Sequence, residues 1–261
     1  MPRFSANLGF LWADRPLLER IAAAGAAGFR AVELHYPYEF EPAAVADACA
    51  RANVALLGLN TSMGPRPEDR GLAAVPGRED DARRVIDQAF DFARDAGGTS
   101  VHVMAGLVPP AEHAAGRRTL VAALRHAAER SAETGLVTLL EPLNPADMPG
   151  YFYGRISEAL PVIEEVGSDR VKLMFDCYHV GKVGEDPVAL LRAHFDKVGH
   201  IQIAAVPSRA EPDEGEIDYR TVFTAIDELG YSGWVGAEYR PRAGTDEGLA
   251  WMSRLGVTPG A

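Results

Sequence analysis

The stretch Val171–Asp176 reads VKLMFD, a mostly apolar run that stops at one carboxylate. Three more runs have this form: Thr138–Glu141 (TLLE), His200–Ile203 (HIQI) and Trp234–Glu238 (WVGAE). Each is largely apolar and reaches a side chain that carries oxygen. The runs recur about every 26 to 36 residues, close to the length of one strand-plus-helix unit. The pattern predicts parallel strands whose carboxyl ends bring these oxygens together at one end of a barrel.

Strand and helix patterns alternate over the whole chain. Four earlier runs also read as strands: Phe4–Gly9, Ala31–Leu34, Ala55–Leu59 and Ser100–Met104. Apolar residues at steps of three and four predict helices between the strands, most clearly in Glu79–Ala96 and Ala111–Thr134. Eight strands in 261 residues favour a closed (β/α)8 barrel of the α/β class, with residues 1–261 as its single domain. A doubly wound open sheet is the alternative.

Glycines support this alternation. Six of them follow a helical pattern and precede a strand-like run: Gly28, Gly97, Gly135, Gly167, Gly199 and Gly230. Glycine readily adopts the left-handed conformation that ends a helix. The repeated order of helix, glycine and strand favours a βα array over a β-sandwich. No glycine-rich phosphate-binding motif follows a strand, which argues against a nucleotide cofactor.

Composition excludes several classes of protein. Hydrophobic residues make up 47% of the chain and charged residues 24%, which predicts a large folded core. The formal net charge of −11 disfavours nucleic-acid binding but leaves room for a small anion held by a local arginine. Cys49 and Cys177 are too few for a disulfide framework. The sequence has no secretory signal pattern and no apolar run of about 18–20 residues, so we expect a cytoplasmic protein without a membrane segment.

The strand-end oxygens predict a metal site. Its candidate ligands are Glu141, Asp176, Gln202 and Glu238. Three carboxylates in close contact repel one another unless a cation lies between them. Carboxylate and amide oxygens suit Mg²⁺ or Mn²⁺, and the ligand types do not separate these two ions. The set contains no histidine, so zinc and cobalt are less favoured.

Other candidate residues surround this set. His179 follows Asp176 by three residues and is interpreted either as a hydrogen-bond donor to substrate or as a satisfied histidine at the barrel mouth. His102 is a weaker case of the same kind. Two irregular segments, Asn60–Arg78 and Val206–Tyr219, would lie at the carboxyl ends of the strands. Their arginines are candidates for binding a substrate carboxylate or are ordinary surface residues: Arg66, Arg70 and Arg209.

Seven segments carry a resemblance to one family of enzymes. They are FSANLGFLW (4–12), GFRAVELHYPY (28–38), VHVMAG (101–106), EPLNPADMPGYF (141–152), VKLMFDCYH (171–179), GHIQIAAVPSRAEPDEGEIDY (199–219) and GWVGAEYRPRAGTDEGLAW (233–251). Together they resemble the hydroxypyruvate isomerase family of xylose-isomerase-like TIM barrels. The resemblance implies a metal-dependent isomerase of the aldose–ketose type that acts on a short hydroxy-oxo acid. It implies that Glu141 and Glu238 are the acid–base pair, that the four oxygens above are metal ligands, and that His179 and Arg209 contact substrate.

Two loops depart from the family pattern and leave the substrate open. Of the Gly-Asp and Gly-Glu-Arg-Gly elements usual after the third strand, only Glu68, Arg70 and Gly71 remain, and Ala210 replaces a common histidine. We expect interconversion of hydroxypyruvate and tartronate semialdehyde, or of a related acid, through an enediolate. The alternatives are a 2-oxo-tetronate isomerase, a ketose 3-epimerase and a non-catalytic barrel that binds sugar acids. The sequence leaves the oligomeric state open, with a homo-oligomer among the possibilities.

Overall fold

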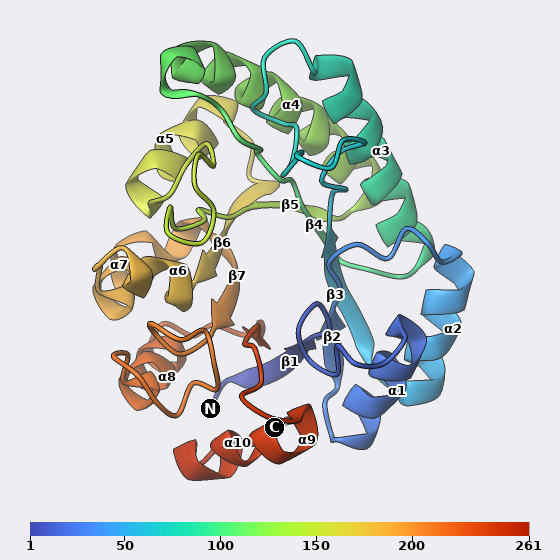
Figure 1. Ribbon diagram of the computed structural model, residues 1–261, viewed down its shortest axis with the longest axis vertical. Coiled ribbons are helices and arrows are strands. Elements are labelled where there is room, and N and C mark those ends of the chain that lie inside the picture. The colour runs from blue at the N-terminus through green and yellow to red at the C-terminus, as the bar shows by residue number, and fades with distance from the viewer. Residues whose placement is uncertain (261) are drawn as a thin grey trace.

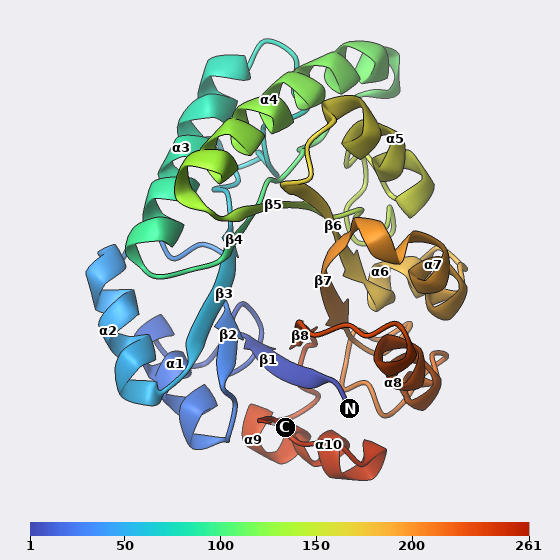
Figure 2. The ribbon, with the colours of Figure 1, turned by 180° about the vertical axis from the view of Figure 1, so that it is seen from behind.

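The computed structural model describes residues 1–260 and shows eight parallel strands closed into a barrel, with helices outside (Figures 1 and 2). The strands follow one another in chain order around the ring, and β8 pairs with β1 to close it. The strands are β1 (Arg3–Asn7), β2 (Ala31–Glu33), β3 (Ala55–Asn60), β4 (Ser100–His102), β5 (Val137–Leu140), β6 (Val171–Asp176), β7 (Val198–Ile203) and β8 (Trp234–Ala237). This confirms the predicted (β/α)8 TIM barrel and excludes the open sheet.

The helices form a ring around the strands (Figure 2). They are α1 (Leu17–Ala26), α2 (Pro42–Ala52), α3 (Glu79–Asp95), α4 (His113–Thr134), α5 (Ile156–Val166), α6 (Cys177–Lys182), α7 (Pro187–His194), α8 (Tyr219–Glu228), α9 (Thr245–Gly248) and α10 (Ala250–Leu255), with short 3₁₀ helices at Pro110–Glu112 and Phe195–Lys197. On α3, the predicted apolar stripe of Ile86, Phe90 and Ala93 is fully buried. Burial of one side chain the size of Ile or Phe stabilises the fold by roughly 1.5–3 kcal/mol. Among the described helices, none is both long and apolar enough to cross a membrane.

One of the six predicted helix-ending glycines does something else. Five have a positive φ between the end of a helix and the next strand, but Gly199 lies inside β7. A Cβ on Gly199 would lie 2.6 Å from Cβ of Lys172 and 2.8 Å from Cδ2 of Leu139. The glycine is therefore needed for close approach to neighbouring strands, and the prediction of a helix end there was wrong.

The barrel interior is polar where many barrels of this class are aliphatic. Ser5, Glu33, His200 and Gln202 are all buried. Aliphatic and aromatic side chains instead fill the layer between strands and helices, as with Phe4. The polar interior continues to the carboxyl ends of the strands, where Glu33 and Gln202 lie.

The two long loops predicted from sequence are present at that end. The first connects β3 to α3 and the second connects β7 to α8. The first is anchored to the residues that follow β4, because Gly71 pairs with Ala105 and the N–H of Ala73 donates to the carbonyl of Met104. Both loops therefore lie beside the strand ends that carry the candidate ligands.

Candidate active site

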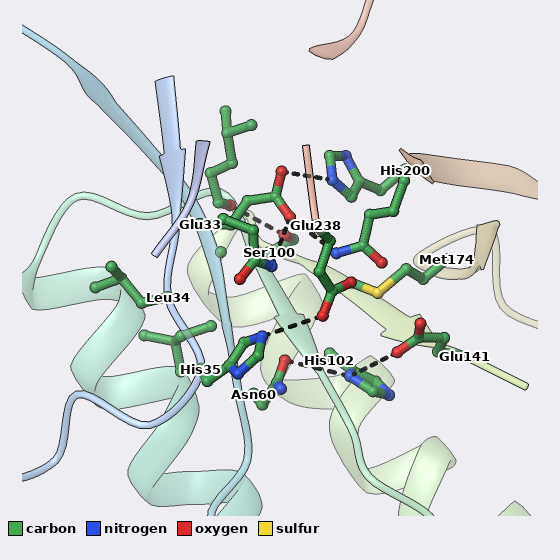
Figure 3. Close-up of a pocket in the computed structure, with 15 residues that line it drawn as sticks. Glu33, Leu34, His35, Asn60, Ser100, His102, Glu141, Met174, His200 and Glu238 are labelled. Atoms are coloured by element: carbon green, nitrogen blue, oxygen red, sulfur yellow. Dashed lines mark hydrogen bonds and ion pairs between the residues drawn. The ribbon is translucent and has the colours of Figure 1, made fainter. Parts of the chain in front are cut away.

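The four candidate metal ligands lie at the carboxyl ends of neighbouring strands. Glu141 directly follows β5, and Asp176 is the last residue of β6. Gln202 is next to last in β7 and pairs in register with Asp176, and Glu238 directly follows β8. All four side chains are buried. Glu141, Gln202 and Glu238 line one cavity in the barrel (Figure 3).

Three of these side chains have one polar atom engaged by a close partner, and Glu141 has only a more distant histidine beside it. Oδ1 of Asp176 accepts the backbone N–H of Tyr178 at 2.8 Å. Oε1 of Glu238 lies 3.1 Å from Nε2 of His35. The other two engage different partners: Nε2 of Gln202 donates to Oε2 of Glu33 at 2.9 Å, and Oε2 of Glu141 lies 3.7 Å from Nδ1 of His102.

One oxygen of each side chain, the only one in the case of Gln202, has no hydrogen-bond partner among the described residues. These atoms are Oε1 of Glu141, Oδ2 of Asp176, Oε1 of Gln202 and Oε2 of Glu238. A buried polar atom without a partner costs about 1–3 kcal/mol, so these oxygens favour a partner from outside the protein chain. Glu141 and Asp176, together with His179, lie close enough to share one ion. Three carboxylate oxygens and one amide oxygen fit a hard divalent cation such as Mg²⁺ or Mn²⁺.

The electrostatics of the carboxylates agree with this fit. Burial and the charges of Glu238 and Asp176 raise the pKa of Glu141 well above its usual value. Burial, followed by the charge of Glu238, raises the pKa of Asp176 to about 7. Burial would also raise the pKa of Glu238, but the hydrogen bond with His35 and the charge of Arg209 lower it. The two glutamates thus prefer opposite protonation states, which is typical of an acid–base pair, and a cation would relieve the repulsion.

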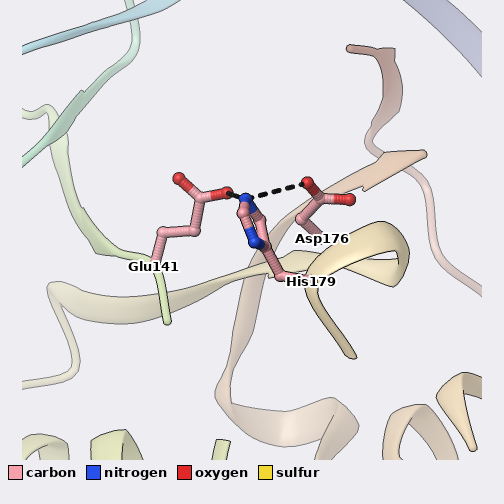
Figure 4. Close-up of side chains that lie close together, drawn as sticks. All are labelled: Glu141, Asp176 and His179. Carbon is pink, nitrogen blue, oxygen red and sulfur yellow. Dashed lines mark ion pairs between the residues drawn. The ribbon is translucent and has the colours of Figure 1, made fainter. Parts of the chain in front are cut away.

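His179, on α6, lies between two of the carboxylates (Figure 4). Its Nε2 is 3.7 Å from Oε1 of Glu141 and from Oδ2 of Asp176, and the three groups are close enough to hold a metal. However, its Nδ1 accepts the backbone N–H of Asn144 at 3.0 Å. A backbone N–H can only donate, so Nδ1 carries no proton and Nε2 must carry it in the neutral ring. Burial lowers the pKa of His179 to about 3, which keeps the ring neutral. His179 therefore presents a donor, not a metal ligand, to the site.

Arg209 brings a partly buried cation to the mouth of the barrel. Its backbone has a φ of 58°, in the left-handed region that few residues other than glycine adopt. Its Cζ lies 4.9 Å from the ring centroids of both Phe10 and Tyr178, so the guanidinium is held between two aromatic side chains. Its Nη2 lies 3.4 Å from Oε1 of Glu238 and 4.0 Å from Oδ2 of Asp176. The loop thus positions Arg209 beside the predicted ligands.

The other two predicted substrate contacts differ from each other. His102 ends β4 and is buried, with Nδ1 3.2 Å from Oδ1 of Asn60. Burial lowers its pKa to about 4, and its Nε2 has no hydrogen-bond partner in the described part of the chain. Arg70 instead donates to the carbonyls of Pro67 and Asp69 in its own loop. Within residues 1–260, no hydrogen bond or ion pair joins Arg70 to the four candidate ligands, so its predicted role gains no contact from the structure.

The sequence interpretation missed three residues that hold the site together. His35 follows β2 closely and contacts Glu238, Glu33 ends β2 and contacts Gln202, and Asn144 follows β5 and contacts His179. The signal was available for the first two, because both stand at the carboxyl end of a predicted strand. The sequence does not show that these two side chains contact Gln202 and Glu238, because the partners lie 169 and 203 residues further along the chain.

Comparison with known proteins agrees with this geometry. The pattern of the xylose isomerase-like TIM barrel family matches residues 21–255. The chain belongs to that family. As a xylose isomerase-like TIM barrel it is 45% identical, over 97% of its length and 98% of the relative, to a protein of Cupriavidus necator named 2-oxo-tetronate isomerase. It is 35% identical, over 97% of its length and 98% of the relative, to the hydroxypyruvate isomerase of Escherichia coli. These relatives confirm the predicted class of enzyme, an isomerase.

Solved structures of the family extend the comparison. A crystal structure titled AP endonuclease, family 2, from Brucella melitensis superposes with a TM-score of 0.94 at 37% identity, covering 97% of this chain and 99% of that one. A D-psicose 3-epimerase from Clostridium cellulolyticum has a TM-score of 0.79 at 17% identity, over 94% of this chain and 87% of that one. At so low an identity, the second match shows only a shared fold.

Proposed function

We propose that this member of the xylose isomerase-like family is a metal-dependent isomerase of a short 2-oxo-3-hydroxy acid. The observation that carries the proposal is the set of four buried oxygens without partners at the strand ends. A partly buried arginine beside them offers a cation for the acid group of such a substrate. A four-carbon 2-oxo-tetronate is the favoured substrate, because the relative with 45% identity carries that name and the hydroxypyruvate isomerase of E. coli is 35% identical. Hydroxypyruvate is the second candidate.

Glu141, Asp176, Gln202 and Glu238 would hold Mg²⁺ or Mn²⁺ through their unpartnered oxygens. When bound, the ion would supply positive charge that stabilises negative charge on two neighbouring substrate oxygens. The ion would also explain why burial of these carboxylates is tolerated, since it replaces the hydrogen bonds that they lack.

The two glutamates would move the carbon-bound proton. Glu238, whose pKa is lowered, is ionised and removes the proton from the carbon that bears the hydroxyl group. The electron pair left on that carbon forms a double bond to the neighbouring carbon and gives an enediolate. Glu141, once it has taken up a proton from solvent, returns it to that neighbouring carbon, and Glu238 gives its own proton back to solvent, so both side chains end as they began. The hydroxyl proton passes to the former carbonyl oxygen, so the reaction needs no oxidant or reductant.

His179 and Arg209 would position the substrate. The Nε2–H of His179 can donate to a substrate oxygen that lies between Glu141 and Asp176. The guanidinium of Arg209 can bind the substrate carboxylate with two parallel hydrogen bonds. Its position between Phe10 and Tyr178 restricts its motion and shields it from water. Such fixed orientation favours reaction over mere binding.

The alternatives receive less support. The 3-epimerases match at low identity and support only the fold. A nuclease would need a basic surface for phosphates, whereas this chain has a formal net charge of −11, and we propose that it binds no nucleic acid. A non-catalytic barrel would not need two glutamates of opposed protonation beside a cation site.

The test is an assay of the purified protein on a 2-oxo-tetronate, hydroxypyruvate and free ketohexoses, after exhaustive EDTA treatment and after addition of Mn²⁺. We expect isomerisation of one or both acids, lost with EDTA and restored by Mn²⁺. In D₂O, deuterium should appear at the carbon that receives the proton. Full activity after EDTA would contradict the metal site, and complete retention of the original hydrogen would indicate a hydride shift. Turnover of ketohexoses alone would indicate an epimerase.

A further inference from the structure

Another buried carboxylate, that of Glu33, lies deeper in the barrel than the candidate ligands. Glu33 accepts hydrogen bonds from the hydroxyl of Ser5, from Nδ2 of Asn7 at 3.4 Å and from Nε2 of Gln202 at 2.9 Å. Its Oε1 also lies 3.0 Å from Nε2 of His200 (Figure 3). None of the steps proposed above uses Glu33, although its surroundings are as elaborate as those of the ligands.

Gln202 explains why such a residue is needed. A glutamine amide has an oxygen end and an NH₂ end of nearly equal size, and only the oxygen can bind a cation. Nothing in the side chain itself selects which end faces the mouth. An ionised carboxylate accepts hydrogen bonds but donates none, so it attracts the NH₂ end and repels the oxygen end.

We propose that Glu33 is a positioning residue that holds the amide of Gln202 with its Oε1 directed at the cation site. The inference rests on the proposed metal site. The observed arrangement fits it, because Nε2 of Gln202 is bonded to Glu33 and Oε1 is the atom left without a partner.

The neighbours of Glu33 donate hydrogen bonds to it and hold it in place. His200 and Ser5 contact its Oε1, which leaves Oε2 directed at Gln202. Gly236, on β8 next to the strand of Gln202, leaves room for both side chains. A Cβ there would lie 2.4 Å from Oε1 of Glu33 and 2.9 Å from Cγ of Gln202. A glycine in mid-strand weakens a sheet, so its presence here is explained by this close approach.

The test is a cycle of Mn²⁺ affinities measured by titration calorimetry on the full chain: wild type, Glu33→Gln, Gln202→Ala and the double variant. We expect Glu33→Gln to weaken Mn²⁺ binding by about 10-fold or more, as changes to groups that orient metal ligands commonly do. In the Gln202→Ala background the same change should add little, since the amide that Glu33 orients is gone. An equal loss in both backgrounds would overturn the proposal, because it would show that Glu33 acts only on the fold.

A swapped pair provides a rescue. In Glu33→Gln combined with Gln202→Glu, the amide lies at position 33 and can donate to the carboxylate at position 202, which again presents an oxygen to the mouth. This variant should regain the affinity lost in Glu33→Gln, and continued weak binding would contradict the proposal. It also retains one amide and one carboxylate, so it serves as the test if Glu33→Gln alone does not fold.

A matched control is Thr138→Val on β5, which removes one buried hydrogen bond, to Ser131, without touching the site. Its Mn²⁺ affinity should equal that of the wild type, and a loss as large as that of Glu33→Gln would count against a specific role for Glu33. If the wild type itself bound no Mn²⁺, the proposed metal site would be wrong, and this inference with it. Normal wild-type binding without the expected coupling would overturn this inference alone.

Discussion

Two polar clusters lie one above the other in this barrel, and they differ in how completely their atoms are hydrogen-bonded. The lower cluster is Glu33 with its partners, and the upper cluster is the four candidate ligands. In the lower one, Glu33 has both oxygens engaged by Ser5, Asn7, Gln202 and His200. In the upper one, every candidate ligand retains one buried oxygen without a hydrogen-bond partner in residues 1–260. Both clusters are deeply buried, so burial alone does not separate them. The pairing of the carboxylate and amide oxygens does separate them, and it agrees with the proposal that the lower cluster supports the site and the upper one binds the ion.

The pKa values of Glu33 and Glu141 shift in opposite directions. Burial tends to raise the pKa of Glu33 and of Glu141 alike. For Glu33, the charge of His200 and the hydrogen bonds from His200, Ser5 and Gln202 together outweigh burial and lower the pKa. For Glu141, neighbouring carboxylates add to the effect of burial. Hydrogen-bond donors thus stabilise the ionised form of Glu33, whereas the carboxylates around Glu141 disfavour its ionised form, as expected for a group that would bind the proposed cation.

The largest expected effect is at the upper cluster. Glu141→Gln and Glu238→Gln should each lower kcat by about 10²–10⁴-fold, because an amide keeps the shape of the side chain but cannot exchange the proton. Steady-state kinetics on the preferred acid would measure this, with circular dichroism to verify the fold. Glu164→Gln, on an exposed part of α5, is the matched control and should leave kcat unchanged. Most of the wild-type rate in either active-site variant would refute the proposed acid–base roles.

The next effect separates the two arginines predicted from sequence. Arg209→Lys should raise KM about 10–100-fold, because lysine lacks the planar fork and the stacking between Phe10 and Tyr178. Arg70→Lys should change KM much less, since its guanidinium bonds to carbonyls of its own loop. Equal effects of the two changes would show that the loop of Arg70 closes onto the substrate.

A smaller effect concerns pH. Protons on Glu141 and Asp176 compete with a cation, so Mn²⁺ affinity should fall as pH drops below about 7. The fall should be up to about tenfold per pH unit for each proton that the ion must displace. In the ion-free protein the sign is opposite for stability. The folded state retains protons on Glu141 and Asp176 that the unfolded chain releases near pH 4, so the contribution of these two groups to the free energy of unfolding should decrease as pH rises from about 4 to 7. The contribution of His102 and His179, whose pKa values are lowered, should increase over the same range. Calorimetric titrations and urea unfolding across this range would measure both, and a flat Mn²⁺ affinity would contradict the raised pKa values.

The smallest effect is expected in the lower cluster. Ser5→Ala removes one of several hydrogen bonds to Glu33 and should lower the free energy of unfolding by about 1 kcal/mol. Mn²⁺ affinity should stay within about twofold of the wild type, because the bond from Gln202 to Glu33 remains. Urea unfolding and calorimetry provide the two measurements. A loss of affinity as large as that of Glu33→Gln would mean that the two clusters act as one.

The sequence predicted the upper cluster better than the lower one, and the reason is physical. Glu141, Asp176 and Glu238 end strands of a repeating unit, and parallel strands place such residues together whatever the details of packing. The engagement of each oxygen depends on side-chain orientation, which no periodicity encodes. Glu33 was missed because its partners come from strands at both ends of the chain. Gly199 was misassigned because close approach of strands and the end of a helix both require glycine.

Closure of the ring has a consequence for how the protein acquires its activity during folding. Strand β8 pairs with both β7 and β1, and Glu238 directly follows it. The last proposed ligand therefore arrives with the strand that completes the barrel. A folding intermediate with seven strands would lack both this carboxylate and the wall that shields the other three ligands. Binding of the cation would then report completion of the fold, and the ion would stabilise only molecules in which the ring has closed.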